Sequence, residues 1–496
     1  MTIPMLRNPC LVLPVILSLL LGSNRLIAEK TDTSSLQPND IVTAIEADLE
    51  DAERLAGVSP KVEIHDGVVT LSGQVTSLQD KHLASRIAKR TRGVEAVLNQ
   101  ILVKTSERSD DAIREDVLKV LRVNDSIDKP QIVVDVSAGQ VAMTGKVDSL
   151  TEKRIAEFVA SGVRGVTDVE NQLTVKLLPM RSDDELRDEI NALVVHSVYL
   201  DDADVQVDVQ NHVVKLAGRV STAEMKDRLE VLAEVRGVKE VDVSEVAVDP
   251  SMADGTRRKA RYADVTDAKI SDAVERVFHA DPVVFGHADA ISANVADGVV
   301  SLSGTVTRLR IKDKAERLAM DVIGVRRVAN ELKVEYSEQP PSDIEIVQET
   351  QAAIRRSPYL DRRDVRVHSQ RAHVSLYGVV ESETEKQVAG WLASGVTGVV
   401  HVNNSLAVEK KWEQKSDEKI REDLNRKLKF ALFDTSNQID VTVQDGVAIL
   451  QGEVDTWRQW QAVLDLTLEA GAKHPHNLIN VRYHPPHGAS KVYVPR

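Results

Sequence analysis

The chain has little cysteine and few aromatic residues, and both shortages exclude classes of protein. Cys10 is the only cysteine among 496 residues, so no disulfide can link two parts of the chain. Aromatic residues make up 3% of the sequence, so the hydrophobic cores must consist of Val, Leu, Ile and Ala. The patterns G-x-S-x-G, G-x-G-x-x-G and H-E-x-x-H and the phosphate-binding P-loop are also absent. The sequence therefore predicts no enzyme, no cofactor and no evident small-molecule substrate.

The first 28 residues have the pattern of an export signal. Arg7 supplies a positive charge, and the apolar run LVLPVILSLLL at 11–21 is shorter than a membrane span. Small residues follow, and we expect cleavage after Ala28; an uncleaved anchor is the alternative. Cys10 precedes the apolar run and is not placed as a lipoprotein cysteine. The segment predicts an exported protein, in the periplasm or the cell envelope.

The mature chain is expected to be acidic. Removal of residues 1–28 takes away Arg7 and Arg25 and no acid, which leaves 61 basic against 77 acidic side chains, a net charge of −16. An evenly acidic protein is repelled by phosphate backbones, so nucleic acid is not an expected partner. Contact with anionic lipid would require local basic patches.

One ten-residue motif occurs six times. It reads DGVVTLSGQV at 66–75 and returns at 138–147, 211–220, 297–306, 371–380 and 445–454. The second glycine of the motif recurs in successive copies at spacings of 72, 73, 86, 74 and 74 residues. A period of this length predicts an array of small domains rather than one large core. Units of this size are only marginally stable alone, so neighbouring units are expected to support one another.

The pattern within each repeat predicts helix, strand, strand, helix and strand. In the motif, Val69, Leu71 and Val75 alternate with polar residues, which is typical of an antiparallel hairpin covered on one face. We interpret the strand glycine as lying on the covered face, where a helix approaches closely. These strand glycines are Gly73, Gly145, Gly218, Gly304, Gly378 and Gly452, and the turn glycines are Gly67, Gly139, Gly298 and Gly446.

The predicted fold class is α+β: a tandem array of six small αββαβ units, each a three-stranded mixed sheet with two helices on one face. The expected order is a signal peptide (1–28), unit one (39–104), unit two (109–177), unit three (182–248), a linker (249–264), unit four (266–335), unit five (342–408), unit six (416–484) and a tail (485–496).

Two motifs at constant spacing resemble the BON domain, a small αββαβ module of exported bacterial proteins. They are D-G-x-V-x-L-x-G-x-V and, some 20 residues on, G-V-x-x-V-x-N-x-L-x-V, which is complete at 324–334. His212 and Ala372 replace the turn glycine, Val243 replaces the asparagine, and 470–481 is a looser match. The resemblance implies an envelope location and a binding role that often involves membrane phospholipid, and it implies no catalytic residues.

A row of lysines is the first candidate contact site. The eighth position after each strand glycine holds Lys81, Lys153, Lys226, Lys312 and Lys386, and Trp460 in unit six. A lysine row is suited to lipid headgroups or another polyanion. The alternative is a solvated helix face with local ion pairs, for example to Glu152 or Glu385.

Two tryptophans mark the second helix of unit six. Trp457 replaces a leucine of other units and is expected to pack in the core. Trp460 is expected to be exposed, and beside Arg458 it is suited to a membrane interface. Packing of Trp460 against a preceding unit is the alternative.

Three other features remain open. The asparagines Asn99, Asn171, Asn330, Asn404 and Asn477 are expected to bind nearby backbone rather than form a site. The tail histidines His474, His476, His484 and His487 match no metal-binding spacing, so no metal site is predicted. The linker carries the basic cluster Arg257, Arg258, Lys259 and Arg261 and is interpreted as a hinge that divides the array three plus three.

These observations favour an exported, non-catalytic array that binds an envelope component, with membrane phospholipid as the first partner and an envelope protein as the second. The alternative is a structural or chaperone-like scaffold that binds other proteins. The sequence leaves the oligomeric state open.

Overall fold

The computed structural model describes residues 36–483 and 491–493, apart from gaps at 53–54, 56–57, 59, 106, 123, 125–126, 128–130, 177–180, 253–261, 263–264, 282, 336–339, 358–359, 361–364, 381–382, 409–414, 432 and 434–437. The export signal, the basic cluster at 257–261 and the histidines at 484 and 487 lie outside these residues. None of the helices in the described ranges is both long enough and apolar enough to cross a membrane.

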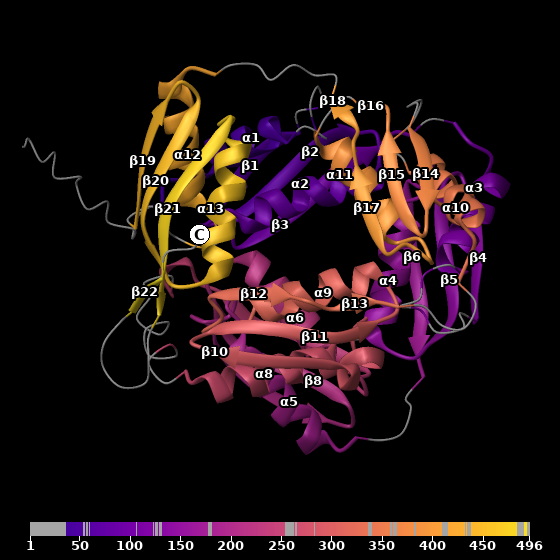
Figure 1. Ribbon diagram of the computed structural model, residues 1–496, viewed down its shortest axis with the longest axis horizontal. Helices are drawn as coiled ribbons and strands as arrows, with labels where there is room; N and C mark the ends of the chain where they lie inside the picture. Colours follow the sequence, from indigo (N-terminus) through magenta and orange to yellow (C-terminus); the bar gives the residue numbers. More distant parts are fainter. Residues whose placement is uncertain are drawn as a thin grey trace, which may run out of the picture. The chain divides into compact units, whose positions relative to one another are not determined.

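Each unit contains the predicted five elements in the predicted order (Figure 1). Unit one consists of α1 (Pro38–Asp51), β1 (Lys61–His65), β2 (Val68–Val75), α2 (Leu78–Arg90) and β3 (Ala96–Val103). Unit two consists of α3 (Asp110–Arg122), β4 (Gln131–Ser137), β5 (Gln140–Val147), α4 (Leu150–Ser161) and β6 (Asp168–Val175). Unit three consists of α5 (Asp183–His196), β7 (Asp204–Gln210), β8 (Val213–Val220), α6 (Ala223–Ala233) and β9 (Glu240–Val248).

The later units add small variations. Unit four has α8 (Asp267–Ala280), the 3-10 helix η3 (Phe285–Ala290), β10 (Ile291–Ala296), β11 (Val299–Val306), α9 (Leu309–Met320), β12 (Arg327–Asn330) and β13 (Lys333–Val334). Unit five has α10 (Asp343–Arg356), β14 (Arg366–Gln370), β15 (His373–Tyr377), β16 (Val379–Val380), α11 (Glu383–Ser394), β17 (His401–Asn404) and β18 (Ala407–Val408). Unit six has α12 (Asp417–Phe430), β19 (Ile439–Gln444), β20 (Val447–Val454), α13 (Trp457–Glu469) and β21 (His474–Tyr483), followed by β22 (Lys491–Tyr493).

The sheets confirm the predicted α+β class. In unit one β1 pairs antiparallel with β2, and β2 pairs parallel with β3, so the second strand lies in the middle. The same order recurs in the other units. In unit six, α12 and α13 lie on one side of the sheet formed by β19, β20 and β21 (Figure 1). One sheet face therefore builds the core and the other is free of helices.

Each unit has its own aliphatic core, as the low aromatic content requires. In unit two, Ile113, Val117 and Leu121 lie along α3 at helical spacing and pack against Val141 and Met143 of β5. All five side chains are at most 1% exposed. Serine or threonine caps begin most of the helices, and the predicted capping boxes Ser182–Glu185 and Ser342–Glu345 are both present.

The hairpin turn has the same backbone form in all six units. Asp66 and Gly67 have φ values of 46° and 75°, the positive pair that a tight type I′ hairpin turn requires. Asn211–His212 and Arg371–Ala372 adopt the same positive φ values without glycine. The missing turn glycines of units three and five therefore leave the turn geometry unchanged.

A carboxylate explains how those turns tolerate side chains at positive φ. In unit five the first residue of α10, Asp343, accepts hydrogen bonds from the backbone N–H groups of Arg371 and Ala372, both at 2.9 Å. Equivalent aspartates do this in units two, three, four and six: Asp110, Asp183, Asp267 and Asp417. Unit one has Pro38 at this position.

The strand glycine does not have the predicted role. Gly145 has φ +133°, and a Cβ added there would lie 2.0 Å from the carbonyl oxygen of Gln131, on the neighbouring strand. An added Cβ would meet a backbone carbonyl oxygen at or next to the start of the neighbouring strand in the same way at Gly218, Gly304 and Gly452. The motif glycine is therefore required by a backbone conformation open only to glycine and by the adjacent strand, not by an approaching helix.

A helix does approach another glycine, the one in the turn that follows the second helix. Gly165 has φ +95°, and a Cβ there would lie 2.8 Å from Cδ1 of Ile113 on α3. Gly93, Gly324 and Gly398 lie against the corresponding isoleucine of their own first helix. This position combines a positive-φ helix end with a close side-chain contact.

Neighbouring units make specific backbone contacts. The residue before the glycine that follows the second helix donates its N–H to a backbone oxygen in another unit, that of the last residue of the first helix. These hydrogen bonds run from Arg92 to Phe430 at 3.2 Å, from Arg164 to Arg356 at 3.4 Å and from Ile323 to His196 at 2.8 Å. These contacts join unit one to six, two to five and four to three. The expected mutual support between units is thus provided by first helices and the segments that end second helices.

Two expectations about unit ends change. Residues 474–483 form one continuous strand paired along β20, so the end of unit six is regular despite its looser match to the motif. At the end of the linker, Tyr262 is 4% exposed and packs with Val198 of unit three and Ile323 of unit four. A hinge in this linker remains a prediction. A hinge motion would have to preserve or break the packing of Tyr262 against units three and four.

The glycine geometry yields a stability test. Gly145→Ala is expected to destabilise the chain by about 1–3 kcal/mol, because alanine is strained at this φ and its Cβ would strike the Gln131 carbonyl. The control is Gly286→Ala, where no atom lies within 4 Å of the added Cβ. Urea denaturation should separate the two variants, and equal stabilities would contradict this assignment.

The turn carboxylate yields a pH test. Hydrogen bonds from the Ser369 hydroxyl and from the Ala372 and Arg371 N–H groups lower the pKa of Asp343 below its ordinary value of 3.8. This stabilisation is therefore present above about pH 4 and is lost as the pH falls through the lowered pKa. We expect Asp343→Asn to melt below the native protein at pH 6, with the gap closing toward pH 2.5. Glu331→Gln, an exposed carboxylate, serves as control; a gap that does not depend on pH would refute the role of the charge.

Candidate binding site

The asparagines of the third strand join that strand to the second helix. In unit four, Nδ2 of Asn330 donates to the backbone oxygen of Lys312 at 2.9 Å, and its Oδ1 accepts from the N–H of Leu332. Asn99, Asn171 and Asn404 make the same bond to the carbonyls of Lys81, Lys153 and Lys386. The asparagines are structural, as expected, and their partner is the backbone of the lysine row itself.

Lysine side chains in the row complete the same junction. Nζ of Lys312 donates to the backbone oxygen of Leu332 at 2.8 Å, and Nζ of Lys226 donates to that of Val246 at 2.6 Å. Val246 pairs with the strand glycine Gly218, so the acceptor lies on the edge strand β9, opposite the motif glycine of the middle strand. All five lysines are only half-exposed. Lipid contact by the row remains a prediction, and the structure shows a helix–strand link at two of its members.

Trp460 takes the place of the lysine in chemistry as well as in sequence. Its indole N–H donates to the backbone oxygen of Ile479 at 3.2 Å, and Ile479 pairs with the strand glycine Gly452. Its ring stacks on Trp457 with centroids 4.3 Å apart, and both rings pack on the core of unit six. The prediction that Trp460 is exposed is wrong, whereas the packing predicted for Trp457 is confirmed.

Arg458 contacts another unit. Its guanidinium lies 2.8 Å from the carboxylate of Asp321 in unit four and stands over the ring of Tyr199 in unit three. The structure therefore does not bring the lysine row, Trp460 and Arg458 together as one surface. Their lipid contact remains an untested prediction.

The site that sequence analysis missed is a cavity of about 370 Å³. Its apolar wall comes from the second helices of units two and five and includes Phe158, Val159, Val388, Trp391 and Leu392. The rings of Phe158 and Trp391 meet edge to face at 6.5 Å. Both rings are nearly half exposed, at 46% and 45%. A cavity of this size and composition lies within the range of small-ligand sites.

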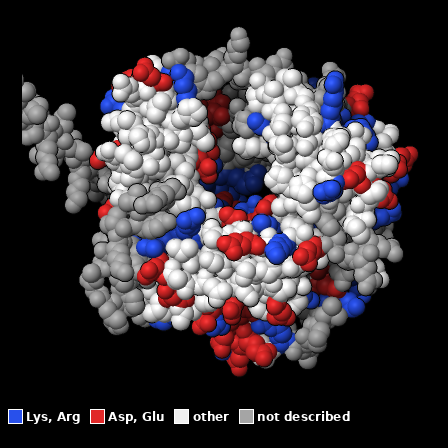
Figure 2. Space-filling view, viewed as in Figure 1, with Lys and Arg blue, Asp and Glu red and all other residues white. Residues whose placement is uncertain are grey.

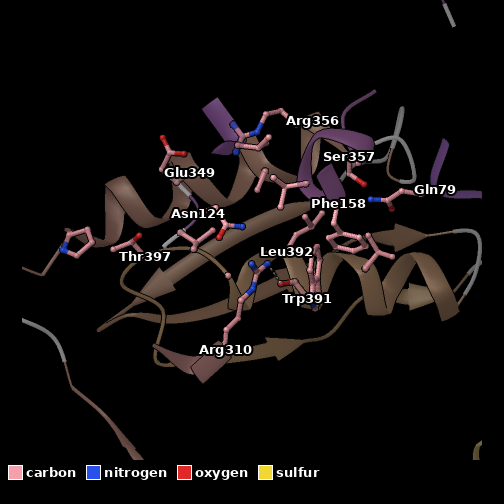
Figure 3. A pocket seen from close by; sticks show the side chains of 18 of the residues that line it. Gln79, Asn124, Phe158, Arg310, Glu349, Arg356, Ser357, Trp391, Leu392 and Thr397 are labelled. Atoms are coloured by element: carbon pink, nitrogen blue, oxygen red, sulfur yellow. Dashed lines mark hydrogen bonds between the residues drawn. The ribbon is translucent and has the colours of Figure 1, made fainter. Parts of the chain in front are cut away.

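Two arginines flank the aromatic pair (Figure 3). The guanidinium of Arg310 lies 4.3 Å above the ring of Trp391 and donates to its backbone oxygen at 3.1 Å. On the opposite side, Nε of Arg356 is buried without a hydrogen-bond partner in the described part of the chain. Burial lowers the pKa of Arg356, and the nearby carboxylates Glu349 and Asp116 oppose that effect.

The carboxylates around the cavity already have cationic or N–H partners. Glu349 lies 3.6 Å from Nζ of Lys119, and Asp116 lies 2.8 Å from the guanidinium of Arg108. Glu345 accepts from the backbone N–H of Ser342 in the cap of α10. The cavity thus combines apolar walls with a guanidinium N–H that lacks an acceptor, an arrangement suited to an amphiphile with an anionic group.

One sequence signal pointed to this site. Phe158 and Trp391 both stand 13 residues after their strand glycine, where the other units carry Arg86, Val231, Arg317 and Asp465. An aromatic residue at an exposed helix position in only two of six copies, with none in the other four, is the kind of difference that marks function. Within the described ranges, no three histidine, cysteine, aspartate or glutamate side chains are placed so that they could hold a metal ion.

A family model described as the BON domain matches this chain six times, at residues 38–105, 109–176, 182–250, 266–336, 342–410 and 416–483, more than half of its length. Among curated proteins, the chain is 27% identical over 167 residues to osmotically-inducible protein Y of Escherichia coli (strain K12), a match that covers 31% of this chain and 83% of that protein. The six matches confirm the resemblance stated from the motifs.

Among solved structures, the chain resembles CdsD, a structural protein of the type III secretion system of Chlamydia trachomatis. That match has 14% identity, covers 46% of this chain and 94% of that chain, and has a TM-score of 0.14. The C-terminal domain of the same protein matches with 14% identity over 46% of this chain and 100% of its own length, with a TM-score of 0.12. TM-scores this low carry no conclusion about this chain.

The helix–strand junction can be tested in unit six. Trp460→Lys is expected to leave stability nearly unchanged, because lysine fills this position in five other units and can donate to the same carbonyl. Trp460→Ala is expected to cost about 2–4 kcal/mol through lost packing and an unpaired carbonyl. Chemical denaturation gives the stabilities, and vesicle co-sedimentation gives lipid binding. If Trp460→Ala abolished vesicle binding at unchanged stability, the lipid role of Trp460 would be restored.

Proposed function

The chain belongs to the BON domain family, and from that membership we propose that it is an exported, non-catalytic protein that binds anionic phospholipid of the cell envelope. The cavity between Phe158 and Trp391 is the observation that carries this proposal. The similarity of the chain to an osmotically inducible protein supports a role in envelope integrity or stress tolerance.

The cavity matches the two parts of a phospholipid. The apolar wall can cover a segment of acyl chain, and each methylene removed from water contributes about 0.8 kcal/mol. The Arg356 guanidinium is a donor suited to a phosphate oxygen. A phosphate there would supply the acceptor that the buried Nε lacks.

The charge of the whole chain favours a built site over general adsorption. The full sequence carries a net charge of −14, so an anionic bilayer repels most of its surface. Binding must then rest on local contacts where burial strengthens each electrostatic interaction. The cavity provides such a place, whereas the lysines Lys226 and Lys312 already donate within their own units.

A second candidate function is a protein-binding scaffold, and one observation favours it. The short strand β22 pairs antiparallel with the outer edge of β21, so a third-strand edge in this chain accepts an added strand. The corresponding edge strand β3 of unit one presents Leu98 and Leu102 at 50% and 64% exposure. Extended segments of other proteins bind sheet edges in this way.

Filling the cavity tests the lipid proposal. Ala353→Phe places a ring among the lining residues and is expected to weaken binding of a short-chain phosphatidylglycerol, kept below its micelle concentration, about tenfold or more. Arg356→Gln is expected to weaken the same binding about tenfold by removing the charged donor. Titration by intrinsic tryptophan fluorescence, which includes Trp391, measures both.

The matched control is Ala329→Phe, which adds the same ring on the outer sheet face of unit four. Native-like binding by all three variants, with unchanged melting temperatures, would refute the cavity as the lipid site. Protection of an unfolding client protein without any lipid binding would favour the scaffold instead.

A further inference from the structure

The outer face of the unit five sheet gathers three histidines. His373 of β15 pairs directly with His401 of β17, and their ring centroids lie 5.8 Å apart. His368 of β14 pairs with Ser375, two residues along β15 from His373 and on the same face. All three imidazoles are exposed. Three imidazoles, a group that can carry positive charge, therefore share one small surface.

Carboxylates are absent from this face within the described strands. Arg366 of β14 is exposed on it, and the turn adds Arg371. Asp343 of α10 interacts electrostatically with His368, and its oxygens accept hydrogen bonds from the Ser369 hydroxyl at 2.5 Å and from two turn N–H groups. The described strands of this face therefore contribute no carboxylate that would offset positive charge on the histidines.

Other outer faces differ. In unit two the exposed face carries Asp135, Asp168 and Glu170, and in unit three it carries Asp204, Asp208 and Glu240. The surface over β14, β15 and β17 shows few charged side chains (Figure 2). The outer face of unit five thus differs from the acidic outer faces of units two and three.

Apolar side chains border the same face. Tyr377 is 47% exposed and pairs across the strands with Arg366, and Val379 is 49% exposed. Tyrosine beside arginine is typical of surfaces that meet the headgroup region of a bilayer. A flat sheet face also fits a flat partner better than it fits a small ligand.

We propose that the outer face of the unit five sheet docks on an anionic bilayer when His368, His373 and His401 become protonated. The identity of the partner rests on the proposed function, but the surface is separate from the cavity. Full protonation changes the formal charge of the three histidines from 0 to +3. Each cation beside an anionic membrane strengthens binding about fivefold, so the three together supply the pH dependence.

The test uses the mature chain and vesicles that contain phosphatidylglycerol, with phosphatidylcholine vesicles as the neutral comparison. Co-sedimentation at pH 5.5 and 7.5, in EDTA to remove bridging metal ions, is expected to show binding at least about tenfold tighter at pH 5.5. The variant H368Q/H373Q/H401Q is expected to lose most of this difference. Its substitutions lie on an exposed face, and an unchanged melting curve will show that the fold is intact.

A matched control removes three other exposed histidines. His65 lies on the outer face of unit one, and His474 and His476 lie on that of unit six, where Asp440 and Glu453 are also present. The variant H65Q/H474Q/H476Q should retain the full pH difference. Burial raises the pKa of Glu234 to about 7, so this carboxylate also takes up protons in the tested window. It is kept in all variants and cannot produce a difference between them.

The outcomes separate this inference from the cavity proposal. Equal vesicle binding at both pH values, with normal binding of short-chain lipid by the cavity, would overturn the docking surface alone. Loss of pH dependence in both histidine variants would assign the effect to total charge and overturn it as well. Binding of a soluble polyanion such as heparin, but not of vesicles, at pH 5.5 would replace the bilayer by another acidic partner. Persistence of docking in Ala353→Phe would show that the two surfaces act independently.

Discussion

The junction between the second helix and the third strand is the contact on which each unit depends. The third strand follows its helix in sequence and must pair with the middle strand in one register. An asparagine fixes the position of this strand by binding the helix backbone, as Asn330 does at the carbonyl of Lys312. A lysine or tryptophan from the helix then donates to the strand at the residue opposite the motif glycine. Without this link, a three-stranded sheet with an aliphatic core would have few directional contacts to select its register.

The junction also changes the meaning of repeated charged residues. Lysine at a fixed position in five repeats resembles a ligand-binding row, but its side chain can serve as a long donor that reaches across from helix to strand. Replacement by Trp460 keeps the donor and loses the charge, which shows that unit six needs the hydrogen bond rather than the positive charge. Residues that repeat with the fold are therefore used by the fold, and the sites proposed above lie at residues found in only one or two units.

Ion pairs between units use some of the other charged side chains. Nζ of Lys427 in α12 is 2.8 Å from the carboxylate of Asp48 and 3.0 Å from that of Asp51, both in α1. Lys427 is 3% exposed, and its pKa is raised because these carboxylates outweigh the effect of burial. Such a pair is costly to break when only one partner is removed. Helices that would otherwise be solvated are thus covered by other units, while the outer sheet faces remain available for binding.

Much of the fold could be predicted because it depends on local patterns. Strand alternation, helix caps and the repeat period identified six αββαβ units, and the structure and the family matches agree with them. Two local interpretations failed for one reason. The neighbours of the motif glycine and of Trp460 come from other strands and helices, and alternation along a single strand does not reveal them.

The sequence by itself determined the number of units, their order of elements and the absence of known catalytic motifs, because these follow from residues close together in the chain. The tertiary structure alone decided which residues could form a site. It brought Phe158 and Trp391 together from positions far apart in the sequence, and it placed three histidines of unit five on one sheet face. Pairing between distant segments depends on how strands align and how units pack, and these are properties of the folded chain as a whole.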